Sequence, residues 1–123
     1  MREIKFRGKS LEHNKWFYGY LEEVVLCESN KFYIIQFSDW GLNIRFEVDE
    51  KSIGQYIGLK AKNEIRIYEG DIIEFMAAKK DFAEMEKCTI TVKDITKDNF
   101  KIERITDRKV IGNIYENPKT INN

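Results

Sequence analysis

The chain of 123 residues has little of what reactive or disulfide-bonded proteins depend on: two cysteines, one histidine and one proline. Cys27 and Cys88 are far apart and form no CxxC pair, so neither a redox motif nor a disulfide framework is indicated. His13 lies in a predicted turn, and a single imidazole is poor material for a zinc site or a catalytic triad. We therefore expect reduced thiols, no metal and no cofactor.

Net charge is also absent, because 21 basic residues balance 21 acidic ones. No overall field attracts nucleic acid or an anionic membrane. The charges are nevertheless uneven along the chain. Basic residues gather at the start and acidic residues in two later groups: Arg2, Lys5, Arg7 and Lys9, then Glu22, Glu23 and Glu28, and finally Glu47, Asp49 and Glu50.

Long hydrophobic runs are missing as well. The first ten residues lack the apolar core of a signal peptide. Apolar runs such as Val24–Cys27 and Phe32–Ile35 are too short to span a bilayer. We therefore expect a protein of the cytoplasm, without contact with a membrane.

Aromatic residues, in contrast, are plentiful: eight Phe, six Tyr and two Trp. A chain of this length fits one domain, since domains cluster near ~100–150 residues. We expect a single domain over residues 1–123, with possible β-rich subdivisions at 1–50 and 51–123.

The dominant hydrophobic period is two, which is typical of strands. Alternating segments separated by polar turns are REIKFRG, KWFYGYLEEVVL, KFYIIQF, LNIRFEV, SIGQYIGL, IRIY, IIEF, CTITVK, NFKIERI and KVIGNIYENP, where Pro118 ends the last strand. This pattern predicts an all-β, mainly antiparallel barrel or sandwich, in which SH3-like elements are possible.

Residues 76–87 break the period of two. Ala78, Phe82 and Met85 fall at helical spacing, and the alanines favour a helix. We expect at most one short helix, near 76–87, and a loop around Asp94–Asn99.

Turn-forming residues punctuate the second half of the chain, and a carboxylate flanks Gly70 on each side. The expected structural turn positions are Gly58, Asn63, Gly70, Asp71 and Gly112. Glu69 and Asp71 could in principle share a metal in a hydrolase. An aspartate after a turn glycine more often accepts hydrogen bonds from the backbone, so we expect no catalytic residue here.

Arginines beside aromatic residues are the best candidates for a ligand site. Arginine binds phosphate through its fork of donors, and aromatic faces stack on bases, although aromatics at period two also serve as core. The ligand-binding candidates are Arg7, Trp16, Tyr18, Arg45, Tyr56, Arg66, Tyr68, Arg104 and Arg108.

Four blocks of the sequence resemble the YopX family, which consists of small proteins of tailed bacteriophages and prophages. These blocks, in family order, are MREIKFRG, IGQYIGLKAKN, IYEGDII and VIGNIYENP. The resemblance spans nearly the whole chain. It implies an intracellular phage or prophage protein with a β-rich fold, and it implies no established enzymatic activity.

The chain departs from that pattern at Asn63-Glu64, where the family typically has Asn-Gly. Asn-Gly suits a tight type I′ hairpin turn and glutamate suits it badly, so we expect a wider or differently shaped loop. Residues 76–87 and 94–109 lie between the blocks, and specific recognition is expected there or on the N-terminal hairpins.

The first functional hypothesis is a non-enzymatic, self-associating binding protein that acts on a host or phage factor. The second is sequestration of a small nucleotide, such as a host defence signal, in an Arg/aromatic pocket. The third is binding of nucleic acid by the β-surface, against which the zero net charge argues. A metal-dependent hydrolase comes last.

Overall fold

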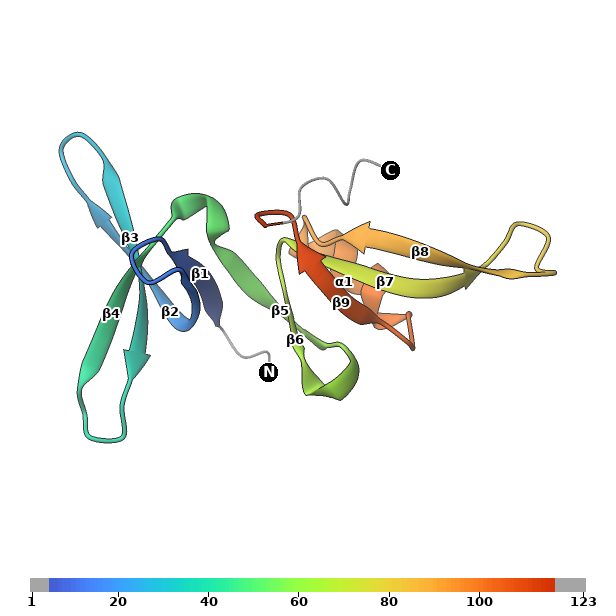
Figure 1. The fold of residues 1–123 in the computed structure, drawn as a ribbon, viewed down its shortest axis with the longest axis horizontal. Helices are drawn as coiled ribbons and strands as arrows, with labels where there is room; N and C mark the ends of the chain where they lie inside the picture. Colours follow the sequence, from blue (N-terminus) through green and yellow to red (C-terminus); the bar gives the residue numbers. More distant parts are fainter. Residues whose placement is uncertain (1–4, 117–123) are drawn as a thin grey trace. The chain divides into compact units, whose positions relative to one another are not determined.

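The computed structural model describes residues 5–116; Arg2 and Pro118, each assigned a role from the sequence, lie outside the described residues. The described chain divides into two compact units, Met1–Tyr56 (unit 1) and Ile57–Asn123 (unit 2) (Figure 1). The predicted mainly antiparallel all-β fold with one short helix is confirmed, and the described residues form no closed barrel. That the chain is one domain stays a prediction.

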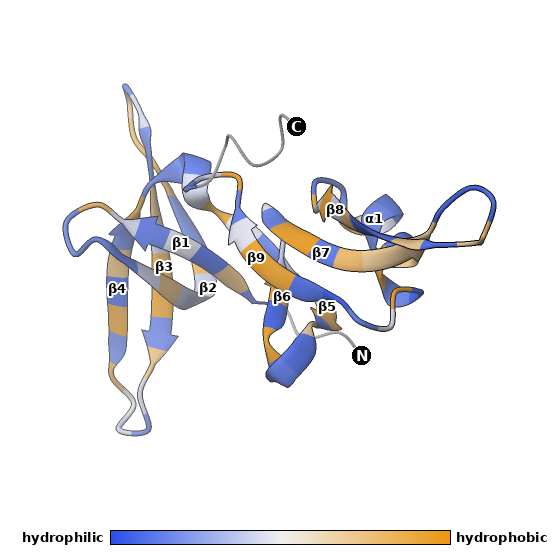
Figure 2. Ribbon diagram, turned by 45° about the vertical axis from the view of Figure 1, so that its right-hand side comes forward, coloured by the Kyte–Doolittle hydropathy of each residue, from blue (hydrophilic) through white to orange (hydrophobic). Residues whose placement is uncertain are grey.

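Unit 1 is an antiparallel meander in the order β4-β3-β2-β1, followed by the first residues of a further strand that pair with β1. Its strands are β1 (Phe6–Ser10), β2 (Lys15–Val25), β3 (Asn30–Phe37), β4 (Asn43–Val48) and the start of β5 (Gly54–Lys60). A short 3₁₀ turn at Glu50–Ser52 precedes β5. Figure 2 shows the alternation of apolar and polar residues along β3 and β4 that predicted these strands.

One face of this sheet forms the interior of unit 1. Phe17 and Phe46 stack there with ring centroids 3.7 Å apart, and Ile34 and Val48 are buried beside them. A side chain at Gly8 would lie within 3.0 Å of Val48, so β1 approaches β4 closely only because that residue is glycine.

Unit 2 combines a short strand pair with a three-stranded sheet and a helix. Its elements are the remainder of β5, a 3₁₀ turn at Lys62–Glu64, β6 (Arg66–Tyr68), β7 (Asp71–Ala78), β8 (Met85–Thr91), α1 (Ile95–Glu103) and β9 (Lys109–Asn113). The three-stranded sheet has the order β8-β7-β9, and α1 lies against one of its faces (Figure 1).

The core of unit 2 is an aliphatic cluster contributed by five elements or their flanks. Ile57, Ile67, Ile73, Val92 and Ile102 all have no exposed surface. Each buried side chain of this size contributes roughly 1.5–3 kcal/mol relative to exposure. Figure 2 shows apolar residues along β7 and β9, next to this cluster.

The single α-helix within residues 5–116 lies at Ile95–Glu103, so its predicted position near 76–87 and the loop expected around Asp94–Asn99 were both wrong. Asp94 caps the helix by accepting hydrogen bonds from the hydroxyl and backbone N–H of Thr96 and the backbone N–H of Lys97. These contacts lower the pKa of the Asp94 carboxyl, the Thr96 hydroxyl being the largest cause. A cap and a buried face with Ile102 outweigh the period-two pattern that predicted a strand here.

Residues 76–87 form the end of β7, a turn and the start of β8. Ala78, Phe82 and Met85 are all exposed, so their helical spacing had no surface on which to pack. Without a buried face, a short helical pattern is weak, and the hairpin pairing between Ala78 and Met85 prevails.

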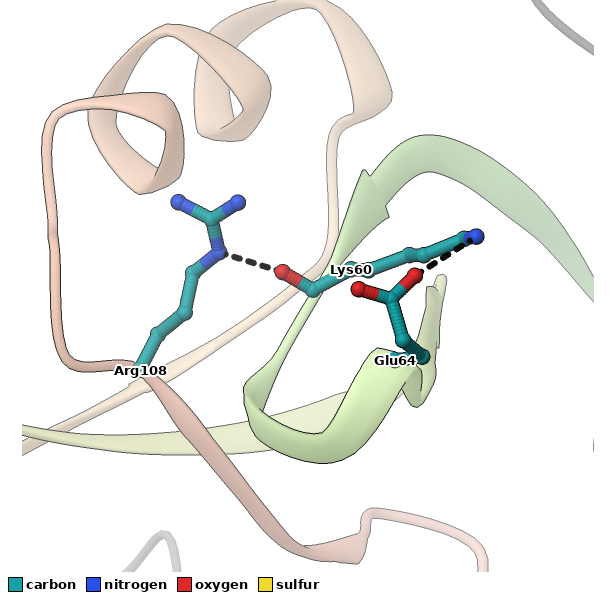
Figure 3. A network of polar contacts seen from close by, with 3 residues as sticks. All are labelled: Lys60, Glu64 and Arg108. Atoms are coloured by element: carbon teal, nitrogen blue, oxygen red, sulfur yellow. Dashed lines mark hydrogen bonds and ion pairs between the residues drawn. The ribbon is translucent and has the colours of Figure 1, made fainter.

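The loop after β5 keeps a tight turn despite its glutamate, contrary to the expectation of a wider loop. Asn63 and Glu64 both have φ of 62°, and the N–H of Ile65 donates to Lys62 O at 3.4 Å. Positive φ at both central residues is the property of a type I′ turn. Lys60 Nζ lies 3.0 Å from Glu64 Oε2, and this ion pair spans the turn (Figure 3).

Candidate functional site

The outer face of the unit 1 sheet, opposite the face that holds Phe17 and Phe46, carries a row of rings. Strand register places these residues together, since Arg7 is opposite Tyr18, Lys9 opposite Trp16 and Tyr20 opposite Ile35. We call this surface the aromatic face and define it by its ring-bearing and aliphatic members: Trp16, Tyr18, Tyr20, Tyr33, Ile35 and Phe37.

A hollow of about 460 Å³ lies on the aromatic face. Its lining residues are Lys5, Tyr18, Gly19, Tyr20, Ile35, Gln36 and Phe37. Tyr20 and Phe37 are 55% and 59% exposed and meet edge to face at 5.2 Å. A volume of this size is within the range of small ligand and side-chain pockets.

At the hollow, the backbone of β2 at Gly19 lies very close to the backbone of β3 at Ile35. Any Cβ at Gly19 would overlap Ile35 O on the neighbouring strand. Gln36, which also lines the hollow, donates from Nε2 to Tyr18 O at 3.1 Å and links β3 to β2 there. The hollow is therefore shaped by main chain as well as by rings.

The cations of the aromatic face are held by rings and carboxylates of the same unit. Arg7 and Lys9 lie over the Trp16 ring, at 4.9 Å and 5.9 Å from its centroid. Arg45 lies 4.3 Å from the centre of the Tyr33 ring and 3.0 Å from Glu22 Oε1. The positive charge of Arg45 is thus balanced locally by the Glu22 carboxylate.

The remaining arginine candidates belong to unit 2. Arg104 follows α1 and lies 4.2 Å over the Phe100 ring, and Arg66 is half-buried at the start of β6. Since Arg7 and Arg45 belong to unit 1, neither unit alone contains the whole Arg/aromatic set.

Arg108 ties together three segments of unit 2. Its Nε donates to Lys60 O at 2.7 Å (Figure 3). Its Nη1 donates to Ile102 O at 3.1 Å and to Ile105 O at 2.9 Å. These three carbonyls satisfy two guanidinium nitrogens, so Arg108 has a structural role in joining the end of β5 to the end of α1.

Tyr56 and Tyr68 lie in the interior, with 5% and 3% of their surface exposed. Their rings therefore present no stacking face to a ligand. Aromatics at period two often become core, and the structure moves both tyrosines from the candidate ligand set into the packing.

In the acidic turn at Gly70, the Asp71 carboxylate accepts a hydrogen bond from the main chain. Asp71 is 1% exposed, and its Oδ2 accepts a hydrogen bond from the N–H of Tyr68 at 2.8 Å. Gly70 has φ of 94° and Gly58 has φ of 90°, values that glycine adopts without strain. Gly58 lies within β5, and Gly112 lies within β9 opposite Ile72, so the turns predicted at these two glycines were wrong.

Other reactive groups are dispersed. His13 packs edge-on against Phe17 and Phe46 at 5.9 Å. Cys27 and Cys88 are free thiols. Within residues 5–116, no three His, Cys, Asp or Glu side chains are close enough together to hold a metal, and no helix is long and apolar enough to cross a membrane.

Sequence reasoning left Tyr20, Tyr33 and Phe37 out of the candidate set, although they belong to the aromatic face. The available signal was β2, where bulky residues occupy both alternating positions. A strand with two apolar faces in a single-layer sheet leaves one of them exposed. The exposure of Phe82 was not predicted either, because its spacing with Ala78 and Met85 had placed it in a helix.

Comparison with known proteins identifies the family and the fold. One solved structure, described as the crystal structure of protein EF1440 from Enterococcus faecalis, is 23% identical, with a TM-score of 0.50 over 98% of this chain and 99% of the other. At this identity the likeness shows the fold alone. No curated protein matches the chain significantly. The sequence profile described as YopX protein matches residues 5–122, nearly the whole length, and the chain therefore belongs to the YopX family.

Proposed function

We propose that the protein is a non-enzymatic binding protein that recognises another protein, a host or phage factor, through the aromatic face of unit 1. The observation that carries this proposal is the hollow between Tyr18, Tyr20 and Phe37. Tyrosine and tryptophan are enriched among the residues that dominate binding energy in protein interfaces.

Part of the positive charge on the aromatic face is already paired with carboxylates, which favours a protein over a nucleic acid. Phosphate contacts need cations that can neutralise several phosphates. On the aromatic face, Arg45 is paired with Glu22, and Lys31 Nζ is 4.0 Å from Glu47 Oε1. Mixed charge around exposed rings suits a protein surface of mixed polarity.

A nucleotide remains the second candidate, because Tyr20 and Phe37 could stack on a base and Lys5 lines the same hollow. The sequence-based version of this hypothesis used an arginine fork. The residues of the hollow include no arginine, which weakens it.

The test compares protein capture by the tagged wild type and by the double variant Tyr20→Thr, Phe37→Thr. Threonine keeps the strand preference and removes both rings. The matched control is Leu11→Thr, which removes another exposed apolar side chain of unit 1 outside this hollow. Captured proteins are quantified by mass spectrometry from cells in which the protein is naturally made.

We expect a protein that is retained by the wild type and the control and is lost at least tenfold with the double variant. Equal capture by all three variants would contradict the proposal. Native mass spectrometry of the wild type tests the second candidate. A retained nucleotide, a small ligand that fits a pocket of this size, would add roughly a few hundred daltons per chain.

A further inference from the structure

The hairpin between β7 and β8 presents a single large ring at its tip. Phe82 is 84% exposed and has φ of 62°, a left-handed conformation in which a bulky residue is a rare outlier. Figure 1 shows the two strands of this hairpin extending as an arm of unit 2.

The tip is held by its own hydrogen bonds. The N–H of Phe82 donates to Lys79 O at 2.8 Å, and the N–H of Lys79 donates to Glu84 O at 2.8 Å. Asp81 Oδ1 accepts from the N–H of Ala83 at 3.0 Å, and Lys79 Nζ is 3.0 Å from Glu84 Oε2. The ring is therefore displayed by an ordered turn. The left-handed backbone of Phe82 is maintained by the turn itself, and backbone strain of this kind is concentrated at functional sites.

We infer that the occupant of the hollow is Phe82 from a second copy of the chain, so that the protein associates with itself head to tail. The inference rests on the proposed function, because it uses the aromatic face as a protein-binding surface. The projecting ring of Phe82 and a hollow lined by Tyr20, Ile35 and Phe37 are complementary in polarity.

Charge supports the same occupant. Lys80 and Asp81 precede Phe82 at the tip, where Lys79 is already paired with Glu84. Lys5 lines the hollow that would receive the ring, on the side of the contact to which Asp81 would be drawn. An acidic group beside the inserted ring would meet a basic group at the receiving surface. Since the two surfaces of each copy are different, the contact is heterologous and repeats from copy to copy.

Two variants that each remove one surface test the inference by complementation. Phe82→Asn deletes the ring, and asparagine tolerates the left-handed region, so the turn is kept. Tyr20→Thr, Phe37→Thr deletes the hollow and leaves the tip intact. Leu11→Thr again serves as the control, and circular dichroism verifies that each variant is folded.

Sedimentation velocity then gives the mass of each protein and of their mixture. We expect wild type and control to form multiples of the chain, and each surface variant alone to be a monomer. An equimolar mixture of the two surface variants should form a dimer that grows no further, because only one working tip and one working hollow meet.

Three results would overturn the inference: a monomeric wild type, assembly that survives Phe82→Asn, or a mixture of surface variants that stays monomeric. The proposed function is judged separately. If Phe82→Asn has no effect on assembly while the hollow variant loses a captured foreign protein, the inference fails and the proposed function stands. If the hollow variant alters neither capture nor assembly, both fail.

Discussion

The two units place their large apolar side chains differently. Unit 2 buries five aliphatic residues completely in one cluster: Ile57, Ile67, Ile73, Val92 and Ile102. Unit 1 buries Ile34 and Val48 on its inner face but leaves Tyr18, Tyr20 and Phe37 exposed on its outer face. The aliphatic residues of unit 2 serve stability, whereas the rings of unit 1 form the proposed binding surface.

The contrast matters because both units have similar sheets of short antiparallel strands. A sheet whose second face is covered can use all its apolar residues for folding. In unit 2 the helix α1 contributes Ile102 to that cover. Large groups of exposed apolar residues are more typical of interaction surfaces, whereas single exposed apolar residues are ordinary.

The largest expected effect comes from opening the core of unit 2. Ile73→Ala removes a fully buried side chain and leaves a cavity, which costs about 2–5 kcal/mol of unfolding free energy. Urea unfolding followed by ellipticity at 222 nm measures this, because α1 is the helix of unit 2.

Tryptophan fluorescence is recorded in the same titration, since the chain has two tryptophans, Trp16 and Trp40, and both belong to unit 1. We expect the tryptophan transition to move less than the helical one. Equal shifts of both transitions would show that the two units unfold together. The proposed difference in how the two units are stabilised would then be contradicted.

A smaller effect is expected at the turn between β5 and β6. Glu64 has φ of 62°, where a non-glycine residue costs roughly 1–2 kcal/mol and glycine adds an entropic cost of roughly 0.5–1 kcal/mol. Glu64→Gly should therefore stabilise unit 2 by about 0.5–1 kcal/mol, measured by urea unfolding.

The control for this substitution is Lys60→Gln, which removes the exposed ion pair with Glu64 and keeps the turn residue. That pair contributes little, because surface ion pairs are well solvated. A Glu64→Gly protein less stable than the control would show that the left-handed conformation is not strained.

The smallest effect concerns pH. The pKa of Asp94 is lowered from its ordinary value of 3.8 by the Thr96 hydroxyl and by the backbone N–H groups of Thr96 and Lys97. The carboxylate form is favoured in the folded state, so its contribution to stability is complete above that ordinary value and is lost as pH falls through the lowered one.

The helical ellipticity of the wild type should therefore decline over this acidic range more than that of Asp94→Asn, whose cap does not titrate. Thermal midpoints measured at several pH values between neutral and acidic conditions give the comparison. Parallel pH profiles for both proteins would contradict the assigned role of the Asp94 carboxylate.

Much of the fold followed from the sequence because period two is a local signal. Strands such as β2 and β4 coincide with the alternating segments within a few residues. The helix was misplaced since the residues that decide it act from outside the pattern: Asp94 as a cap and the core that receives Ile102. Neither the burial of Ile102 nor the exposure of Phe82 can be read from spacing.

The candidate site was predictable only in part, for a related reason. Arg7, Trp16 and Tyr18 were chosen from the sequence and do lie on one face with the rings. Tyr56 and Tyr68 were chosen by the same reasoning, as aromatics at period two near arginines, yet both are buried. Which of two alternating faces is covered depends on tertiary packing, which no single strand encodes.

The most direct test of the division between a stabilising unit and a binding unit uses Tyr20→Thr, Phe37→Thr. Its unfolding free energy and its capacity to bind are measured on the same preparation. The account predicts an unfolding free energy within about 1 kcal/mol of the wild type, as for exposed positions, together with at least a tenfold loss of protein binding. A variant that unfolds much more easily, or one that binds as well as the wild type, would contradict it.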